Sequence, residues 1–467
     1  MNPYKKLIIY LAGHNGMVGN ALMKHLKKKG YKNILYTSKK DLNLLNQIKL
    51  DNYIKLKKPD VIINCAGKVG GILANSTYPV EFLNENILIQ LNLINSAYKN
   101  KIKHFINLGS SCIYPKNSKQ PIKEDYLLTS ELEQTNEAYA LAKIVGLKAC
   151  NFYNKQYKTS YLTLMPCNMY GPKDNFDTKN SHFLPALIKK FIDSKNNKKK
   201  NVEIWGSGLP KREVMHVDDL ASAITFILEK KLSNNKKLIK YIKYNSLINV
   251  GSGQEFTIRK FAEIIKKLTN SKKKLKFNKK YPDGTPRKIL DNRVIKKLGW
   301  KSRVSLVEGL NKTLDWYYKN NNYDYKDIKL SKNYKISIIT VTKNSENFLE
   351  ECILSLEKQS YKNYEHIIID GCSTDNTINI IKKYKTKVAY WVSEKDEGLY
   401  DAMNKGIKKC SGDIIGILNS DDIYYPQALK IVNEYFNFNK ELDFLFGSVN
   451  KYKLMHGYKP KKIKWSF

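Results

Sequence analysis

Four residues lie at spacings that suit proton transfer. Ser110 and Cys112 end an apolar run in the stretch NLGSSCIYP, residues 107–115. Tyr139 and Lys143 are four residues apart in a helical pattern, so a phenol and an ammonium share one helical face. A nearby cation favours the phenolate, and such a tyrosine can exchange a proton with a carbonyl oxygen. These residue types therefore predict acid–base chemistry at a carbonyl group.

Cys112 has two interpretations on the sequence alone. Cysteine is more often a small apolar core residue than a reagent, so packing is the simpler interpretation. The other is that the thiol, which titrates within reach of neutral pH, moves protons in the reaction. If the extended pattern continues past residue 108, Ser110 and Cys112 lie on one face of the same strand end.

A glycine-rich turn upstream predicts a dinucleotide site. The apolar run 7–12 leads into GHNGMVG, which holds Gly13, Gly16 and Gly19, and a helical pattern follows. Such glycines allow a tight turn, close approach of a pyrophosphate and close packing of the helix on the strand. We expect the phosphates at the positive end of this helix.

The end of the second predicted strand, residues 33–37, bears on which nicotinamide cofactor binds. An NAD enzyme usually carries an acid there, which binds the ribose hydroxyls. Here Thr37, Ser38, Lys39 and Lys40 come first, and an acid follows only at Asp41. Hydroxyl and ammonium groups suit a 2′-phosphate and favour NADP, although the lysines also fit a general surplus of lysine.

Strand and helix patterns alternate through the chain, which predicts an α/β fold with parallel sheets. Residues 321–333 (NNYDYKDIKLSKN) are polar and aperiodic, and a new α/β pattern begins directly after them. We therefore expect an enzyme unit over residues 1–320, a linker over 321–333 and a second α/β unit over 334–467.

The net charge of +39 comes from 82 basic and 43 acidic residues, and only five of the basic residues are arginine. Lys, Asn, Ile and Tyr share A/T-rich codons, so genome composition explains the bias without a polyanionic partner. Lysine-rich solvated faces are the simpler interpretation. We expect no nucleic-acid partner, and weak peripheral association with a membrane stays open.

Seven cysteines are scattered without a CxxC pair. The N-terminus lacks the layout of a signal peptide, and no apolar run approaches about 18 residues. These features predict a cytoplasmic protein with reduced thiols and without a transmembrane segment.

Longer stretches carry a resemblance to a known family. They include AGHNGMVG, KVGGILANSTYP, LGSSCIYPK, YALAK, NMYGPKDNF, WGSGLPKREVMHVDD and PDGTPRK, and they extend from residue 7 to about 318. On these stretches the chain resembles the extended short-chain dehydrogenases, and among them the GDP-L-fucose synthases. The resemblance implies a Rossmann domain with a small C-terminal substrate subdomain, and a homodimer formed through the two long helices that bracket the active-site tyrosine. It also implies 3,5-epimerisation of GDP-4-keto-6-deoxy-D-mannose, followed by NADPH-dependent reduction at C4.

The resemblance also implies residue roles. Tyr139 would donate the proton in the reduction, Lys143 would tune it and hold the nicotinamide ribose, and Ser110 would bind near the keto oxygen. Cys112 and His182 would form the acid–base pair of the epimerisation. Cofactor contacts would come from Gly13, His14, Asn15, Gly16, Met17, Val18, Gly19, Ser38, Lys39, Asp41, Leu42, Leu108, Gly109, Lys143, Pro166, Cys167, Asn168, Met169 and His182, and substrate contacts from Lys190, Trp205, Arg212 and Asp283.

Two positions depart from the family pattern. Asn15 replaces an arginine often seen inside the glycine loop, which weakens the grip on a 2′-phosphate. Lys190 stands where some members have arginine, which exchanges a planar fork for a point charge. Two rival enzymes fit less well: a 4,6-dehydratase would carry an acid beside the active-site hydroxyl, and a UDP-hexose 4-epimerase would not need a thiol there.

The second unit resembles the nucleotide half of a family 2, A-type glycosyltransferase, through ISIITVTKN, HIIIDGCSTDNT, SEKDEGLYDAMNKG and NSDD. The resemblance implies that Thr342, Asp370 and Asp421 contact the nucleotide and that Asp422 holds Mg²⁺ or Mn²⁺, a role that suits carboxylates. An inverting transferase also needs an acceptor-side base beyond this half. The unit is therefore either a transferase that uses the sugar made by the first unit or a non-catalytic scaffold for glycan assembly.

Overall fold

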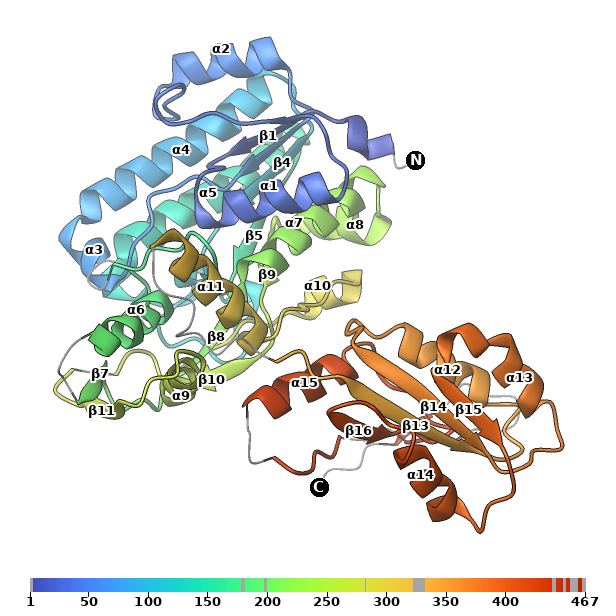
Figure 1. The fold of residues 1–467 in the computed structure, drawn as a ribbon. Helices are drawn as coiled ribbons and strands as arrows, with labels where there is room; N and C mark the ends of the chain where they lie inside the picture. Colours follow the sequence, from blue (N-terminus) through green and yellow to red (C-terminus); the bar gives the residue numbers. More distant parts are fainter. Residues whose placement is uncertain are drawn as a thin grey trace. The chain divides into compact units, whose positions relative to one another are not determined.

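The computed structural model divides the chain into two compact units, residues 1–330 and 331–467 (Figure 1). It describes residues 3–177, 181–196, 200–281, 283–321, 332–438, 442–447, 451–453 and 461–463. Most of the predicted linker, residues 322–331, lies outside the described residues. Each unit is therefore described by itself.

The first unit is built on a six-stranded parallel sheet with the order β2-β1-β3-β4-β5-β9. Its strands are β1 (Ile9–Ala12), β2 (Ile34–Leu35), β3 (Val61–Asn64), β4 (His104–Leu108), β5 (Ser160–Pro166) and β9 (Leu247–Val250). The central strands are almost wholly buried, as expected for a parallel sheet covered on both faces. The strand order reverses between β1 and β3, and ligands of such sheets bind at the carboxyl ends beside that reversal.

Helices cover both faces of this sheet. One layer holds α2 (Gln47–Lys57), α4 (Pro79–Lys99) and α5 (Glu137–Tyr157), and the other holds α1 (Met17–Lys28), α7 (Val217–Leu232) and α8 (Lys236–Tyr244). Alternate strand residues face opposite layers: Tyr10 and Ile62 pack in the core under α2 and α4, whereas Ile9 and Ile63 pack in the core under α1 and α7. The sheet is therefore held between two apolar cores.

Smaller sheets and helices form the substrate subdomain. β7 (Asn201–Trp205) pairs with β11 (Lys274–Asn278), and β8 (Lys211–His216) pairs with β6 (Asn168–Tyr170), β10 (Glu255–Thr257) and β12 (Arg287–Lys288). Besides α7 and α8, the helices after β6 are α6 (Phe183–Asn196), α9 (Ile258–Leu268), α10 (Arg293–Leu298) and α11 (Leu306–Asn320). The shorter helices earlier in the unit are η1 (Pro3–Lys6), α3 (Ile72–Thr77), η2 (Ser111–Ile113), η3 (Glu124–Tyr126) and η4 (Gln134–Asn136).

The extended pattern that would place Ser110 and Cys112 on one strand face does not continue through Cys112. β4 ends at Leu108, and η2 turns the chain at Ser111–Ile113. The turn packs Ile113 and Tyr114 into the apolar core. The two side chains therefore meet through a tight turn and not through the two-residue repeat of a strand.

The second unit has a four-stranded parallel sheet with the order β15-β14-β13-β16. Its elements are β13 (Ile336–Thr342), α12 (Leu349–Glu357), β14 (Tyr364–Asp370), α13 (Thr377–Lys383), η6 (Lys385–Lys387), β15 (Tyr390–Ser393), α14 (Leu399–Ile407), β16 (Ile414–Ile417) and α15 (Ala428–Phe438), and a further pair is formed by β17 (Lys451–Lys453) and β18 (Lys461–Ile463). Thr342, Asp370 and Ser393 are register partners at the carboxyl ends of three adjacent strands.

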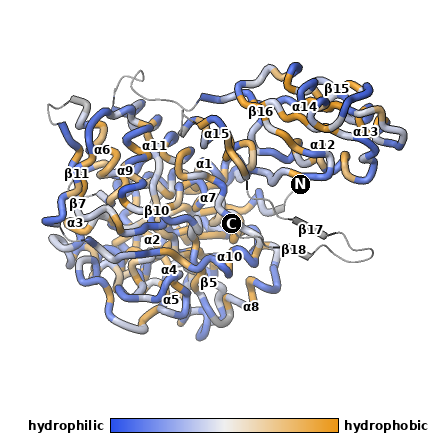
Figure 2. The backbone as a smooth tube through the Cα atoms, turned by 90° about the horizontal axis from the view of Figure 1, so that it is seen from below, coloured by the Kyte–Doolittle hydropathy of each residue, from blue (hydrophilic) through white to orange (hydrophobic). Residues whose placement is uncertain are grey.

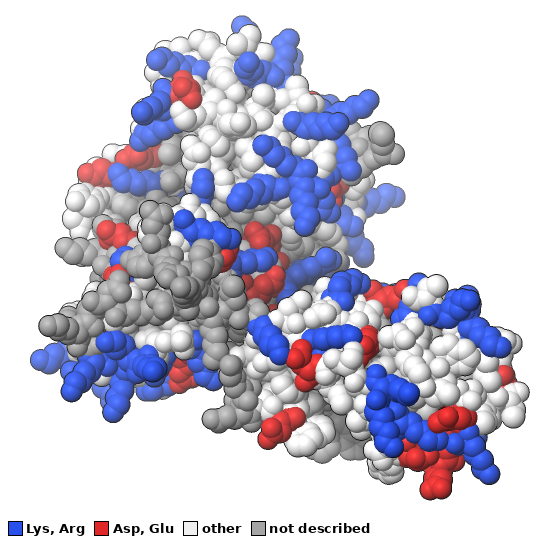
Figure 3. Space-filling model, in the orientation of Figure 1, with Lys and Arg blue, Asp and Glu red and all other residues white. Residues whose placement is uncertain are grey.

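The surface view shows lysine and arginine side chains spread over each unit, with acidic side chains between them (Figure 3). This distribution is the one expected of lysine-rich solvated faces. Hydrophobic and hydrophilic stretches alternate along the chain in both units (Figure 2). Among the described residues, no helix combines the length and the apolar character that crossing a membrane requires.

Candidate active site and nucleotide sites

The glycine loop between β1 and α1 has the geometry of a dinucleotide cradle. Gly13 has a φ of +81°, and a Cβ added there would lie 2.6 Å from the backbone nitrogen of Ala66. A Cβ at Gly19 would lie 2.1 Å from the carbonyl oxygen of Gly13, so only glycine lets α1 pack this closely on the loop. Gly16 caps α1 without a side-chain hydrogen bond, which leaves backbone N–H groups for an anion. Met17 and Val18 form the first turn of α1 and pack against the core.

The side chain of His14 holds this loop against the end of β2. Its imidazole packs on Tyr36, with the ring centroids 4.5 Å apart, and hydrogen-bonds to the backbone of Thr37. Asn15 is exposed at the loop tip. The loop and the predicted 2′-phosphate segment are thus one connected surface.

The groups predicted to bind the 2′-phosphate follow β2 in a turn. The hydroxyl of Ser38 donates to the Asp41 carboxylate over 2.6 Å, and the Asp41 backbone N–H donates back to that hydroxyl. Leu42 is buried beneath the turn, whereas Lys39 is exposed. Asp41 is therefore engaged with Ser38, and the Lys39 ammonium stays available to an anion.

A chain of buried amides fixes α5 relative to the sheet. Asn64 donates to Asn107, Asn107 donates to the Gln90 side-chain oxygen, and Gln90 donates to the carbonyl of Ala142. Gly146 gives Gln90 its space, because a Cβ there would lie 2.0 Å from the Gln90 oxygen. Buried and satisfied amides of this kind impose one arrangement on the helices they join. They fix the helix that carries Tyr139 and Lys143.

The acid–base residues converge at the end of β4. The buried Lys143 ammonium donates to the carbonyl of Leu108 over 3.1 Å and lies 5.6 Å from the centroid of the Tyr139 ring. The Ser110 hydroxyl lies within reach of both the Tyr139 phenol and the Cys112 thiol, and hydrogen bonding to it lowers the pKa of each. Gly109 completes this strand end by donating to the carbonyl of Leu164. The structure thus brings together all four residues that the sequence picks out.

Burial dominates the protonation of these groups. It lowers the pKa of Lys143 to about 8 and raises the pKa of Tyr139, with a smaller opposing contribution from the Ser110 hydrogen bond. It also raises the pKa of Cys112, and the ammonium of Lys288 partly offsets that rise. The sequence argument expected the nearby cation to favour phenolate. In the structure burial acts in the opposite direction, because it raises the pKa of Tyr139 and favours the neutral phenol, the form that can donate a proton.

Lys288 is a site residue that the sequence argument missed. It is paired in register with Arg212 across β12 and β8. The chain after it is anchored on both sides, because Ile289 donates to Gln120 and Leu290 donates to Glu213. Its ammonium lowers the pKa of both Cys112 and His182. For His182, desolvation is the larger cause of the lowering and Lys288 the smaller one. Lys288 lies in the stretch PDGTPRK, and the family resemblance of that stretch could have identified it from the sequence.

The predicted substrate residues come together in the subdomain. The Lys190 ammonium lies 4.5 Å from the centroid of the Trp205 ring, within the range of a cation–π contact. Asp283 accepts hydrogen bonds from the backbone N–H and the hydroxyl of Ser207. Arg212 donates to the carbonyl of Thr285, and Arg212 and Asp283 interact electrostatically. This corner of the subdomain thus presents two cations beside an aromatic face.

The predicted cofactor residues after β5 line the same end of the sheet. Pro166 ends β5, and the backbone N–H of the buried Cys167 donates to the carbonyl of Val250. Asn168 and Met169 open β6, where they pair in register with residues of β8. The pairing of β6 with β8 connects the cofactor half of the unit to the strand that carries Arg212.

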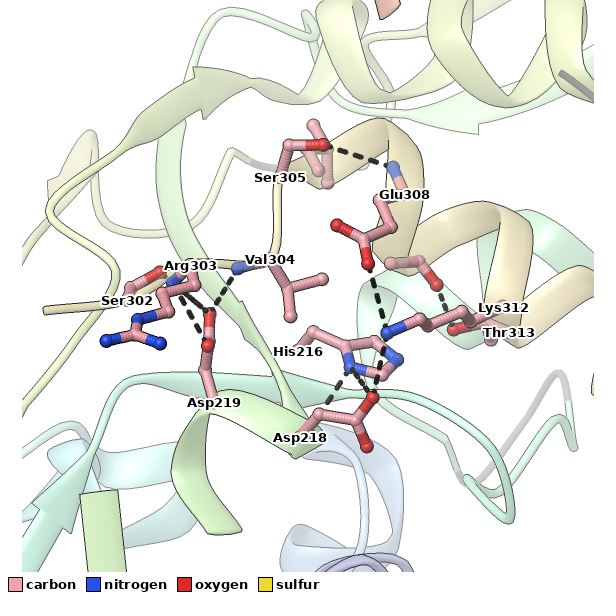
Figure 4. Close-up of polar contacts among 12 residues, drawn as sticks. His216, Asp218, Asp219, Ser302, Arg303, Val304, Ser305, Glu308, Lys312 and Thr313 are labelled. Carbon is pink, nitrogen blue, oxygen red and sulfur yellow. Dashed lines mark hydrogen bonds and ion pairs between the residues drawn. The ribbon is translucent and has the colours of Figure 1, made fainter. Parts of the chain in front are cut away.

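A polar cluster fastens α11 to the start of α7 (Figure 4). The buried His216 accepts a hydrogen bond from the backbone N–H of Asp218 and so caps α7. The Lys312 ammonium bridges Asp218 and Glu308, at 3.1 Å from each carboxylate. Asp219 accepts from the backbone N–H groups of residues 303 and 304 and from the Ser302 hydroxyl. The cluster anchors the end of β8, and with it the Arg212 strand.

The second unit gathers polar groups at the carboxyl ends of its strands. The buried Asp370 accepts from the Ser373 backbone N–H over 3.0 Å, from the Ser373 hydroxyl and from the Ser393 hydroxyl over 2.6 Å. The hydroxyl of the register partner Thr342 is buried and has no hydrogen-bond partner among the described atoms. A donor or acceptor buried in this way is costly unless a ligand completes it.

The two predicted acidic residues lie beyond β16. Asp421 is exposed, and Asp422 accepts a hydrogen bond from the Asn419 side chain over 3.1 Å. The described residues contain no group of three or more His, Cys, Asp or Glu side chains placed to hold a metal ion. Two carboxylates beside a diphosphate suit Mg²⁺, which usually takes only one or two protein carboxylates and completes its shell with phosphate and water.

Comparisons with known proteins match each of the two units to a family. Residues 9–245 match the NAD dependent epimerase/dehydratase family, and residues 337–465 match glycosyl transferase family 2. The chain belongs to the NAD dependent epimerase/dehydratase family. It is an enzyme that carries this Rossmann unit together with a family 2 glycosyl transferase domain.

The relatives match the first unit. GDP-L-fucose synthase 1 of Arabidopsis thaliana is 45% identical over 318 residues, which are 68% of this chain and 94% of the relative. GDP-L-colitose synthase of Yersinia pseudotuberculosis is 42% identical over 317 residues, 68% of this chain and 99% of the relative. A solved structure, the GDP-mannoheptose C4 reductase MlghC of Campylobacter jejuni with NADP bound, is 33% identical with a TM-score of 0.60 and covers 67% of this chain and 98% of its own.

Proposed function

We propose that the first unit converts GDP-4-keto-6-deoxy-D-mannose to GDP-L-fucose with NADPH. The observation that carries the proposal is the meeting of Ser110, Cys112 and Tyr139 at the end of β4, beside the glycine cradle. A reductase needs only the hydroxyl, the phenol and the lysine. The added thiol supports a second chemistry at the same carbonyl.

The epimerisation follows from the acidity of the substrate. The C4 ketone acidifies the protons at C3 and C5, and inversion needs one group that removes a proton and another that returns one on the opposite face. Cys112 and His182 take these roles, because a thiol and an imidazole can each accept and return a proton. The ammonium of Lys288 lowers the pKa of Cys112 and so partly offsets the rise that burial causes. The Ser110 hydroxyl donates a hydrogen bond toward the keto oxygen and stabilises the enolate.

The reduction uses the same phenol. NADPH, when bound, supplies the hydride that C4 receives. Tyr139 gives its proton to the oxygen at C4, and the Lys143 ammonium stabilises the phenolate that remains. Lys190 holds the diphosphate with its ammonium, which acts as a point charge, and Arg212 holds it with its planar guanidinium. The Lys39 ammonium and the Ser38 hydroxyl are the groups that favour NADP over NAD.

The test is to give the whole chain GDP-4-keto-6-deoxy-mannose and NADPH and to identify the product by NMR. We expect GDP-L-fucose. A GDP-6-deoxyhexose still in the D-series would contradict the epimerisation. It would favour a second candidate, a C4 reductase of GDP-sugars, to which the likeness to the GDP-mannoheptose C4 reductase points.

We propose further that the first unit is a homodimer through α4 and α5. Leu88 on α4 and Leu141 and Phe152 on α5 are large apolar side chains exposed by 45%, 41% and 60%. An exposed apolar face of this kind is typical of an interface. Sedimentation velocity is expected to give a dimer for the wild type and a monomer for Phe152→Glu, whereas a wild-type monomer would contradict the proposal.

For the second unit we propose a nucleotide-sugar site formed by Thr342, Asp370 and Asp421, with Mg²⁺ or Mn²⁺ held by Asp422. The orphaned Thr342 hydroxyl and the register of Thr342 with Asp370 support it. The alternative is a non-catalytic scaffold for glycan assembly. A second unit that binds no nucleotide would favour the scaffold.

A further inference from the structure

One aromatic side chain in the substrate subdomain is unassigned. The ring of Tyr281 stacks on that of Trp205, with the centroids 4.4 Å apart and the planes inclined by 17°. Both rings stay well exposed, Trp205 by 54% and Tyr281 by 42%. Tyr281 covers one face of the Trp205 ring and the Lys190 ammonium lies over the ring at 4.5 Å, so the outer face of Tyr281 is the surface left for another flat ring.

The backbone fixes this pair with some precision. Trp205 ends β7 opposite Asn278 of β11, and the Asn278 carbonyl accepts from the backbone N–H of both Gly206 (2.9 Å) and Tyr281 (3.3 Å). The same carbonyl therefore holds Tyr281 and the residue that follows Trp205. The paired ends of β7 and β11 together position the two rings for stacking.

The turn after Trp205 is closely packed against its neighbours. Gly206 and Gly208 both have a φ of +80°, and a Cβ on either would clash, at 2.2 Å from Asp283 and 2.3 Å from Phe277 respectively. Asp283 also accepts two hydrogen bonds from Ser207. The aromatic pair therefore stands on a preformed turn, and little ordering cost would oppose binding to it.

The chemistry beside the pair indicates its ligand. The Lys190 ammonium, which we propose holds a diphosphate, lies against the Trp205 ring, and Arg212 and Asp283 lie on the same turn. Cations beside an exposed aromatic stack match a nucleoside diphosphate, whose phosphates need the cations and whose base needs a π face.

We propose that Tyr281 and Trp205 together form the platform on which the nucleobase of the substrate stacks. The proposal rests on the proposed function, because it concerns the nucleotide end of the same substrate. Stacking tolerates any base, so Tyr281 adds affinity for nucleoside diphosphates and little selection of guanine. It leaves the chemistry at the end of β4 unchanged.

The experiment titrates the whole chain, with NADP present, with GDP and separately with inorganic pyrophosphate. Tyr281→Ala is expected to weaken GDP binding by about 5- to 100-fold and to leave pyrophosphate binding unchanged. Tyr281→Phe is expected to bind GDP within about twofold of the wild type, because the ring is kept. Lys280→Ala, which changes the exposed neighbour in the same loop, is the matched control.

Steady-state kinetics give a second readout. Tyr281→Ala is expected to raise KM for the GDP-sugar with kcat unchanged, because stacking acts equally on substrate and transition state. Unchanged GDP binding by Tyr281→Ala, or an equal loss of pyrophosphate binding, would overturn the platform while the wild-type activity stands. A wild type that neither binds GDP nor turns over the GDP-sugar would overturn the proposed function and the platform together.

Discussion

The ammonium of Lys143 donates a hydrogen bond to the carbonyl of Leu108 over 3.1 Å, and this contact joins α5 to the end of β4. It places the phenol of one chain segment beside the hydroxyl and thiol of another. Two proton-transfer chemistries therefore share one strand end, and substitutions can separate them.

Cys112→Ser is expected to impair epimerisation and spare reduction. Removing one member of the acid–base pair slows proton transfer at carbon by about 10²- to 10⁴-fold, which deuterium incorporation from D₂O at C3 and C5 measures. Hydride transfer to an already epimerised ketone stays close to wild type. Cys372→Ser, which changes an exposed thiol of the second unit, is the control. Equal loss of both steps would assign Cys112 to packing.

Tyr139→Phe is expected to have the reverse pattern. Without the phenol proton, NADPH oxidation falls by about 10²- to 10⁴-fold, while deuterium still enters the sugar. The aromatic ring and its edge contact with Phe82 are kept, so the fold is preserved. If deuterium incorporation stops as well, Tyr139 takes part in the epimerisation and the separation of roles is wrong.

The pKa of Lys143, lowered to about 8 by burial, predicts an alkaline limb in the pH profile. Above that pH the side chain loses the positive charge that stabilises the phenolate. We expect kcat/KM for NADPH, which reports free-enzyme ionisations, to fall as pH rises through about 8. A profile flat to pH 10 would show that Lys143 keeps its proton.

His216 predicts a loss of stability in acid. Burial lowers its pKa to about 4 in the folded state, below the ordinary 6.5, so the unfolded chain binds the additional proton between these values. Stability is therefore fully present above about pH 6.5 and falls as pH drops toward 4, by about 3 kcal/mol for this group. Urea unfolding at pH 7 and pH 4.5 measures the difference.

His216→Asn is the matched variant for this pH dependence. Asparagine also caps a helix but does not titrate, so the variant is expected to lose less stability between the two pH values. The neighbouring Asp218, Lys312 and Glu308 are unchanged in both proteins, and their contribution cancels in the comparison. The same pH dependence in both proteins would contradict the role of His216.

Asp370→Asn tests the second unit. The Ser373 and Ser393 hydroxyls donate to different oxygens of Asp370, so an amide removes one of the two acceptors and disrupts the strand-end cluster. Calorimetry of the whole chain with GDP and Mn²⁺ is expected to find two nucleotide sites in the wild type and one in the variant. Asp443→Asn, at an exposed carboxylate, is the control. A single site in the wild type would favour the scaffold.

Sequence periodicity and spacing by themselves determined the local parts of this protein. The glycine loop, the Tyr139–Lys143 helical face and the alternating strand and helix patterns depend on contacts within a few residues, which local chemistry encodes. Cys112 was readable as a reagent only through its neighbours Ser110 and the downstream Tyr139.

Only the tertiary structure decided which distant groups meet. The charge of Lys288 acts on Cys112 and His182 because β12 pairs with β8. Tyr281 meets Trp205 because β11 pairs with β7. The turn at Ser111–Ile113 and the neutral Tyr139 phenol likewise follow from burial by segments far along the chain. Spacing in one sequence does not encode such pairings, because they depend on the free energy of the whole packed sheet.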